Sequence, residues 1–306
     1  MKIYINRKPV LGPWGGGNKT VTELCDKLAK DGHDVVHDLN LENIDLIFCV
    51  DPRPNEYGHW YQDFINYKMK HDTPIVQRVG DVGTHGKPEL TNLVKQSVNY
   101  SDYVIFPSDW ARKKIGCDLN KSKIIHNAPL SIFHNFKKHN KLEDKNIKIV
   151  THHWSTNPKK GFNYYKELDK YISLNSEMSF TYIGRLPDNY TLQNSNYCSP
   201  TGDNELISKK LSDSDIYLTA SEEEAGANHV LEGMASGLPV VYHNNGGSIP
   251  EYCKDYGIGF ESPQEMIESI KTMKNCYDKH KKEVLNYNDD ISKVVEKYVD
   301  VICNIV

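Results

Sequence analysis

The sequence predicts an α/β fold of two Rossmann-like domains, each built on a doubly wound, mostly parallel sheet. Short apolar runs alternate with longer amphipathic segments along almost all of the 306 residues, which is the pattern of strands and crossover helices. The run at 44–51 is continuously apolar, as expected for a strand buried on both faces of its sheet. The polar segment 133–148 interrupts the alternation and is the best candidate for a linker.

In the first half of the chain, apolar runs and helical periodicity define the elements in order. Gly32 closes the first helix, because glycine readily takes the left-handed conformation at a helix end. We expect strands at 2–6, 33–38, 44–51, 73–81, 102–108 and 122–130, and helices at 19–32, 58–70, 89–101 and 109–116.

The same alternation restarts at Ile147 and continues to the end of the chain. The stretch around 197–203 has no clear pattern, and the last run, 289–303, has apolar residues at helical spacing. We expect strands at 147–154, 179–186, 215–221, 238–244 and 258–263, and helices at 161–174, 203–212, 226–236, 263–274 and 289–303.

Composition excludes several classes of protein. The net charge is −4 and the basic residues are dispersed, so we expect no nucleic-acid partner. No apolar run approaches the roughly 18 residues of a membrane-spanning helix, and the start does not resemble a signal peptide. The seven cysteines form no CxxC pair, which favours reduced thiols and a cytoplasmic location. Peripheral contact with the inner membrane surface and the oligomeric state stay open.

Parallel sheets bind ligands where their strands end, so the loops after strands are the candidate sites. The loop 12–19 is glycine-rich, and Gly16 and Gly17 would let the backbone approach a ligand closely. It is not a GxGxxG motif, so a nicotinamide cofactor is the weaker interpretation. The alternative is a tight strand–helix turn.

A second loop, 77–86, follows the fourth strand and contains Arg78, Asp81 and His85. These side chains could position a substrate or transfer a proton. An exposed polar loop without a function is an equally good interpretation.

A third loop, HHWSTNPKKGF at 152–162, follows the first strand of the second half. Lys159 and Lys160 precede a helix, where lysines and helix amides can neutralise a diphosphate. The alternative is a pair of surface lysines.

The fourth candidate is the stretch EEEAGANHVLE at 222–232. Glu224 and Glu232 are separated by seven residues, about 12 Å on a helix. This is about the span of a nucleotide-diphospho-sugar, with the amides of Ala227 and Asn228 facing the diphosphate between them. Glu222 and Glu223 would be solvated or would complement the helix dipole. The alternatives are a dipole effect for Glu224 and a surface position for Glu232.

Together these motifs resemble glycosyltransferase family 4, which has the GT-B architecture. The stretch DIYLTASEEEAGANHVLEGMASGLPVVYHNNGGSIPEY is similar to the family's paired-glutamate motif over about forty residues. NPKKGF is similar to its lysine–glycine loop, and SDYVIFPSDWARKKI to its late strand–serine–helix element.

The resemblance implies two domains facing across a cleft: 1–135, to which the terminal helix 289–306 returns, and 145–288, which binds the donor. It implies retaining transfer of a sugar from a nucleotide-diphospho-sugar to a glycan or lipid-linked acceptor, with no bound cofactor and no obligatory metal. Glu232 would bind the ribose, Glu224 the transferred sugar and Lys160 the diphosphate. The glycines 15–17 would approach the donor phosphate or the acceptor.

The sequence departs from the family pattern at three places. Ser155 stands where the family usually has an arginine, and Lys159 or Arg185 could replace that cation. The turn after the first glutamate, usually Glu-Gly-x-Gly, is EAGA with Gly226 at its centre. The family's histidine after the fourth strand aligns near Asp81, and either Asp81 or His85 could take its role.

Two other functions remain compatible with the sequence. One is a nucleotide-sugar epimerase or hydrolase on the same two-domain frame. The other is a nucleotide-sugar-binding protein with weak catalysis, which the serine at position 155 favours.

Overall fold

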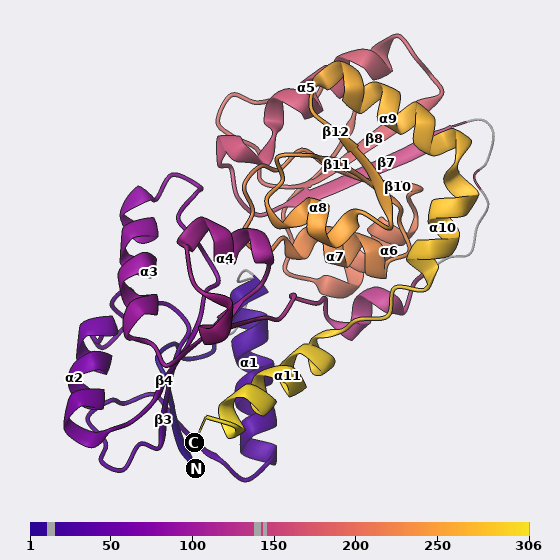
Figure 1. The fold of residues 1–306 in the computed structure, drawn as a ribbon. Coiled ribbons are helices and arrows are strands. Elements are labelled where there is room, and N and C mark those ends of the chain that lie inside the picture. Colours follow the sequence, from indigo (N-terminus) through magenta and orange to yellow (C-terminus); the bar gives the residue numbers. More distant parts are fainter. Residues whose placement is uncertain (11–15, 138–141, 143–145, 306) are drawn as a thin grey trace. The chain divides into compact units, whose positions relative to one another are not determined.

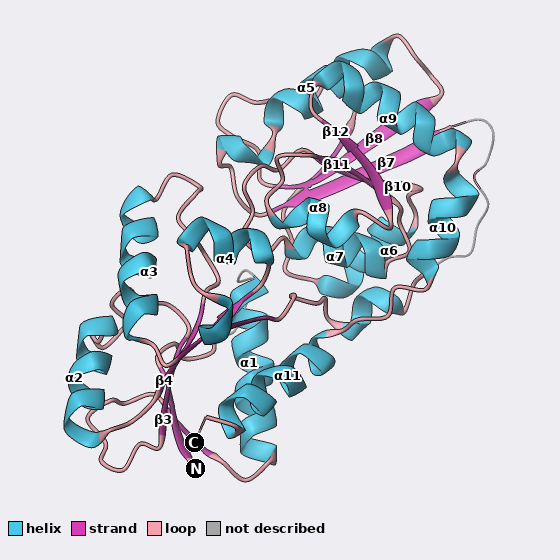
Figure 2. Ribbon diagram, in the orientation of Figure 1, coloured by secondary structure: helices cyan, strands magenta, loops and turns pink. Residues whose placement is uncertain are grey.

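The computed structural model describes residues 1–10, 16–137, 142 and 146–305. The chain divides into two compact units, Met1–Asn127 with Ile291–Val306, and Ala128–Asp290. Each is a parallel sheet covered by helices (Figures 1 and 2). The predicted α/β architecture of two Rossmann-like parallel sheets is confirmed.

The first unit contains six parallel strands in the order β2-β1-β3-β4-β5-β6. The strands are β1 (Lys2–Ile5), β2 (Asp34–Val36), β3 (Leu46–Cys49), β4 (Ile75–Arg78), β5 (Tyr103–Phe106) and β6 (Ser122–Ile124). All of β3 and β4 is buried, and the continuous apolar run at 44–51 predicted this for β3. The strand order reverses between β1 and β3, and ligands bind at such switch points.

Helices cover both faces of this sheet (Figure 1). They are α1 (Gly16–Lys30), α2 (Tyr61–His71), α3 (Pro88–Tyr100), α4 (Asp109–Ile115) and α11 (Ile291–Cys303), with a short 3-10 helix, η1 (Leu119–Lys121). The terminal helix α11 contacts α1 and buries Ile291, Val294, Val295, Tyr298, Val301 and Ile302. The predicted return of this helix to the first unit is therefore confirmed.

The second unit has six parallel strands in the order β12-β11-β10-β7-β8-β9. The strands are β7 (Ile147–His153), β8 (Met178–Gly184), β9 (Asn196–Cys198), β10 (Ile216–Thr219), β11 (Val240–His243) and β12 (Gly257–Phe260). Here the order reverses between β7 and β10, which are direct neighbours in the sheet. Loops that follow these two strands meet at the same edge.

The helices of the second unit form two apolar layers with the sheet. They are η2 (Ser131–His134), η3 (Pro158–Lys160), α5 (Phe162–Ser173), α6 (Asn204–Ser212), α7 (Asn228–Ala235), α8 (Ser248–Cys253), α9 (Pro263–Asn275) and α10 (Tyr277–Leu285). One layer centres on α7 and the other on α5 and α9.

Besides the short 3-10 helices, one strand and two α-helices of the described residues were not predicted. The strand β9 lies in the unpatterned stretch, and its residues are mostly exposed, so it has no apolar signal. The short helix α8 directly follows the glycine turn that ends at Gly247, and α10 has low hydropathy. The linker prediction also needs correction: Phe133 is fully buried in the core of the second unit, so this part of 133–148 is packed structure.

Candidate functional site

The two lysines of the NPKKG loop lie just after β7. Asn157 caps η3, because its side chain accepts a hydrogen bond of 2.9 Å from the Lys159 amide. This cap holds Lys159 and Lys160 in one short turn at the carboxyl end of the sheet. The sequence prediction that both lysines follow the strand and precede a helix is confirmed, and their role toward a diphosphate stays a prediction.

The glutamate turn after β10 is tied to this lysine turn. The Glu222 amide donates to the Lys159 carbonyl at 2.8 Å. Glu223 forms an ion pair with Lys159, and Glu224 forms one with Lys160. The prediction that Glu223 is merely solvated or dipole-matching is therefore wrong, because β7 and β10 are neighbours and bring the two turns together.

The Lys160–Glu224 pair is the more buried of the two. Its side chains are 12% and 14% exposed, against 38% and 21% for Lys159 and Glu223. Charges this far from water need a partner, since burying an isolated charge is costly. The two residues predicted to bind the diphosphate and the transferred sugar thus neutralise each other in this structure.

A third loop, after β11, fixes the backbone of Glu224. The Glu224 amide donates to the Gly246 carbonyl at 3.2 Å, and the Glu224 carbonyl accepts from the Ser248 amide at 2.8 Å. Gly247 has φ of 71°, and a Cβ there would collide with the Glu224 backbone. Only glycine fits this position, so the GGS turn can lock Glu224 in place.

The helix α7 begins at Asn228, later than the predicted start at 226. Only the part from Asn228 to Glu232 is helical, a rise of about 6 Å, so the estimate of 12 Å along one helix is wrong. The Ala227 amide donates to the Ser248 hydroxyl at 3.1 Å. The Ala227 amide therefore has a hydrogen-bond partner within the protein, whereas it was predicted to face the diphosphate. Roles for Gly226 and Asn228 stay predictions.

Glu232 is 9% exposed, as its apolar surroundings predicted. Its carboxylate lies 2.7 Å from Nε2 of His152, and Nδ1 of that ring lies 3.0 Å from the Tyr217 hydroxyl. A carboxylate only accepts, so Nε2 donates to Glu232 and Nδ1 can accept from Tyr217. The His152 ring thus links strand β7 to the Tyr217 side chain of strand β10 and to Glu232 of helix α7.

His152 and Tyr217 were not predicted as site residues. His152 stands at the polar end of an apolar strand, in VTHHW, and this was the available signal. Tyr217 looked like an ordinary core residue in DIYLTAS. Only the pairing of β7 with β10 shows that they meet.

His229 lies beside this group. Its Nε2 lies 3.0 Å from the Thr219 hydroxyl, and its ring packs on the rings of His153 and Tyr217 at 4.8 and 6.2 Å between centroids. Although the residue as a whole keeps some exposed surface, burial of the ring lowers the pKa of His229 from 6.5 to about 3. His229 is therefore neutral throughout the physiological range.

Arg185, the predicted substitute for the missing arginine, follows β8 and is exposed. Its guanidinium lies 5.6 Å from the centre of the Trp154 ring, a cation–π contact. Its backbone amide donates to the His153 carbonyl at 3.2 Å. A role for Arg185 in binding the donor stays a prediction.

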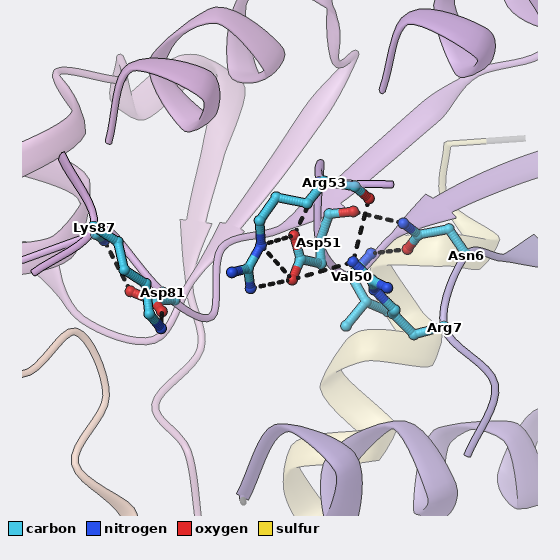
Figure 3. Close-up of polar contacts among 8 residues, drawn as sticks. Asn6, Arg7, Val50, Asp51, Arg53, Asp81 and Lys87 are labelled. Carbon is cyan, nitrogen blue, oxygen red and sulfur yellow. Dashed lines mark hydrogen bonds and ion pairs between the residues drawn. The ribbon is translucent and has the colours of Figure 1, made fainter. Parts of the chain in front are cut away.

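In the first unit, a cavity of about 1130 Å³ lies at the switch point, bounded by the loops after β1, β3 and β4 and by the start of α1. Gly17 and Asp81 line it, whereas His85 is absent from its lining among the described residues. Gly16 begins α1, and the rest of the glycine-rich loop, 11–15, lies outside the described residues. Asp81 binds Lys87 at 2.8 Å and accepts from the Gly83 amide (Figure 3).

Asp51 also lines this cavity and is the centre of a group of polar contacts (Figure 3). Arg53 donates to both of its oxygens, at 2.6 to 3.2 Å, and Arg7 lies 3.4 Å away. Burial alone would raise the pKa of Asp51, but the hydrogen bonds and charge of Arg53 outweigh it and lower the pKa below its usual value. Asp51 is therefore ionised and forms ion pairs with two arginines, Arg7 and Arg53. Asn6 steadies the loop through the Asp51 carbonyl and the Val50 amide.

In the described part of the chain, no helix is long and apolar enough to cross a membrane. No group of three or more histidine, cysteine, aspartate or glutamate side chains is arranged there to hold a metal ion.

Comparison with known proteins decides the family. The model described as "Glycosyl transferases group 1" matches residues 132–288, just over half of the 306 residues. The chain belongs to the group 1 glycosyltransferase family. The matched segment holds the lysine turn, the glutamate turn and α7, so the resemblance drawn from those motifs is confirmed. No curated protein sequence matches the chain.

Solved glycosyltransferase structures share the GT-B fold of this family member. Sucrose-phosphate synthase from Thermosynechococcus elongatus is 12% identical with a TM-score of 0.70, over 100% of this chain and 99% of that one. WaaG, involved in lipopolysaccharide biosynthesis, is 15% identical with a TM-score of 0.66, over 98% and 99%. Anabaena HepE, in complex with UDP-glucose, is 14% identical with a TM-score of 0.67, over 99% of both chains.

Proposed function

We propose that this group 1 glycosyltransferase transfers a sugar from a nucleotide-diphospho-sugar to a hydroxyl of a glycan or lipid-linked acceptor, with retention of the anomeric configuration and without an obligatory metal. The donor binds the second unit, at the switch point between β7 and β10. The acceptor binds the first unit.

The Lys160–Glu224 ion pair carries the proposal. A mostly buried lysine and glutamate lie side by side at the carboxyl end of the sheet, where parallel sheets bind ligands. An incoming diphosphate offers Lys160 a stronger anion than one carboxylate. Once Lys160 turns to the diphosphate, Glu224 is released to accept hydrogen bonds from the sugar hydroxyls.

Lys159 and Lys160 supply the positive charge that stabilises the leaving diphosphate. Ser155 provides no charge where the family usually has an arginine, so these two lysines have the larger share of that task. This supports transfer without an obligatory metal.

Glu232 binds the ribose. Its carboxylate lies 2.7 Å from Nε2 of His152, and carboxylate oxygens are the acceptors that the paired hydroxyls of a ribose need. His152 acts as a positioning residue, because it is fixed in turn by Tyr217 and holds the glutamate in one rotamer. An acid inside an apolar helix is otherwise costly to keep.

Nucleotide binding tests the donor site. Calorimetric titration with UDP, GDP and ADP should identify at least one ligand, and the UDP-glucose complex of HepE makes UDP the first choice. For that ligand, Glu232→Gln should weaken binding by about 10- to 100-fold, the cost of losing hydrogen bonds to a charged group. Glu205→Gln, on an exposed side chain of α6, is the matched control and should have no effect.

Turnover tests the chemistry. Nuclear magnetic resonance of the product should show the same anomeric configuration as the donor, and EDTA should leave the rate unchanged. A product of inverted configuration, or loss of activity in EDTA that a divalent ion restores, would refute those parts of the proposal. Donor consumption at full rate without any acceptor would instead indicate a hydrolase or an epimerase.

A further inference from the structure

The cavity of the first unit contains a cation that the donor site does not use. Arg78 ends β4, lines the cavity and is 5% exposed. Its Nε donates to the Tyr298 hydroxyl at 3.2 Å and its Nη2 to the Asn127 side-chain oxygen at 3.3 Å. Both partners are neutral. Among the described residues, Arg78 forms no ion pair and its Nη1 has no hydrogen-bond partner.

A buried charge without a counter-charge is costly, so an arginine in this state favours an anion in its cavity. The neutral contacts from Tyr298 and Asn127 fix the plane of the guanidinium, and they leave Nη1 as the donor for a ligand. Arginine suits this role because its planar fork matches phosphate and carboxylate oxygens.

Two glycines show where Nη1 lies. A Cβ on Gly80 would collide with it, and one on Gly17 would lie 3.8 Å from it. Gly17 is in the first turn of α1, a helix of 15 residues. The first amides of a helix have no partner within it and carry partial positive charge. Arg78 and the start of α1 therefore face the same point of the cavity.

The other charges leave this position cationic. Asp51 forms ion pairs with Arg7 and Arg53, and Asp81 forms one with Lys87. Five cationic and three acidic side chains line the cavity in all, and its remaining walls are mostly valine, leucine and proline. The cavity thus joins a positive position with an apolar surface.

We propose that the acceptor carries a phosphate group, which binds Arg78 Nη1 and the first amides of α1, and that the apolar walls contact the part of the acceptor next to that phosphate. The inference rests on the proposed function, since it names the acceptor class of the same transferase. The phosphate can belong to a soluble phosphate ester or to a lipid headgroup.

The test measures the acceptor site with the donor site already filled. With saturating nucleoside diphosphate present, calorimetric titration with glycerol 3-phosphate tests the soluble source. Sedimentation with phosphatidylcholine vesicles, with and without phosphatidic acid, tests the lipid source. Glycerol and the vesicles without phosphatidic acid are the uncharged comparisons, and at least one phosphate probe should bind better than its comparison.

Variants assign that binding to Arg78. Arg78→Met should weaken it by about 10-fold or more, the effect of losing a charge-assisted hydrogen bond. Gly80→Ala should weaken it as well, because the methyl group displaces Nη1 while the arginine stays, and it keeps the test valid if Arg78→Met does not fold. Lys95→Met, on an exposed residue of α3 outside the cavity lining, should bind like the wild type.

Each outcome decides a separate question. Binding of either phosphate probe that falls in both the Arg78 and Gly80 variants supports the site and identifies its source. Absence of binding by both probes, or binding that neither variant changes, overturns it. Nucleoside diphosphate affinity is measured in the same samples: its absence in the wild type refutes the donor proposal, whereas its persistence without phosphate binding refutes only the acceptor site.

Discussion

His229 should make the second unit sensitive to acid. Burial of its ring lowers the pKa to about 3 in the folded protein, against 6.5 for an ordinary histidine. Between these two values the unfolded chain binds a proton that the folded chain does not. Stability is therefore fully present above the unfolded pKa, falls as the pH drops below it, and stops falling near the folded pKa.

The size of the effect follows from the two pKa values. An unfolded histidine with a pKa of 6.5 is almost fully protonated at about pH 5, whereas His229 in the folded unit is still neutral. Lowering the pH from about 7 to about 5 should therefore cost about 2 kcal/mol of unfolding free energy through this residue alone. In His229→Gln, which keeps a polar group near Thr219 but does not titrate, this part of the loss should vanish.

Hydrogen exchange of peptides from β7, β10 and α7, measured in increasing urea, reports the unfolding of the second unit separately from the first. Wild type and His229→Gln are compared at both pH values, so other groups that titrate in the same range cancel in the difference. If the variant loses as much stability between the two pH values as the wild type does, His229 does not have the lowered pKa and the argument fails.

Two further substitutions test the packing around the site. Gly233→Ala should destabilise the second unit by about 1 to 3 kcal/mol despite the better helix propensity of alanine, because the new Cβ would lie 2.6 Å from the buried ring of Tyr217. Since Tyr217 contacts His152, the substitution should also weaken nucleotide binding. A higher melting temperature of the variant would contradict this prediction. Phe133→Ala should cost about 3 to 5 kcal/mol, and exchange should accelerate in peptides of the second unit, where Phe133 is fully buried; acceleration confined to the first unit would contradict that placement.

The fold was largely predictable because the central strands of its sheets bury both faces, and this burial produces continuous apolar runs in the sequence, such as that of β3. The elements that were not predicted have no such continuous apolar run in their sequence. The edge strand β9 is held by its pairing with β8 rather than by burial, and α8 depends on a glycine turn whose shape is set by contacts with Glu224.

The site was predictable only in part, for a related reason. Local sequence indicated that Glu232 is buried and that Lys160 and Glu224 follow strands. It could not show which side chain neutralises which, because that depends on strand order. The order β10-β7 places residues 64 and 80 positions apart in contact, so Lys160 meets Glu224 and His152 meets Glu232.

This strand order also couples Glu223 and Glu224 to the lysine turn. Glu224 is held by the Gly246 and Ser248 backbone. Under the proposed function, a diphosphate that draws Lys160 away would let the Glu224 carboxylate change partner while its backbone stays fixed, so that donor binding itself exposes the acid proposed to bind the sugar. The exchange of an internal ion pair for a ligand contact offsets part of the binding free energy, since the pair must be broken first. Under the proposed function, a nucleotide-sugar offsets more of this cost than a free nucleoside diphosphate does, because it supplies hydroxyls for Glu224 as well as a diphosphate for Lys160.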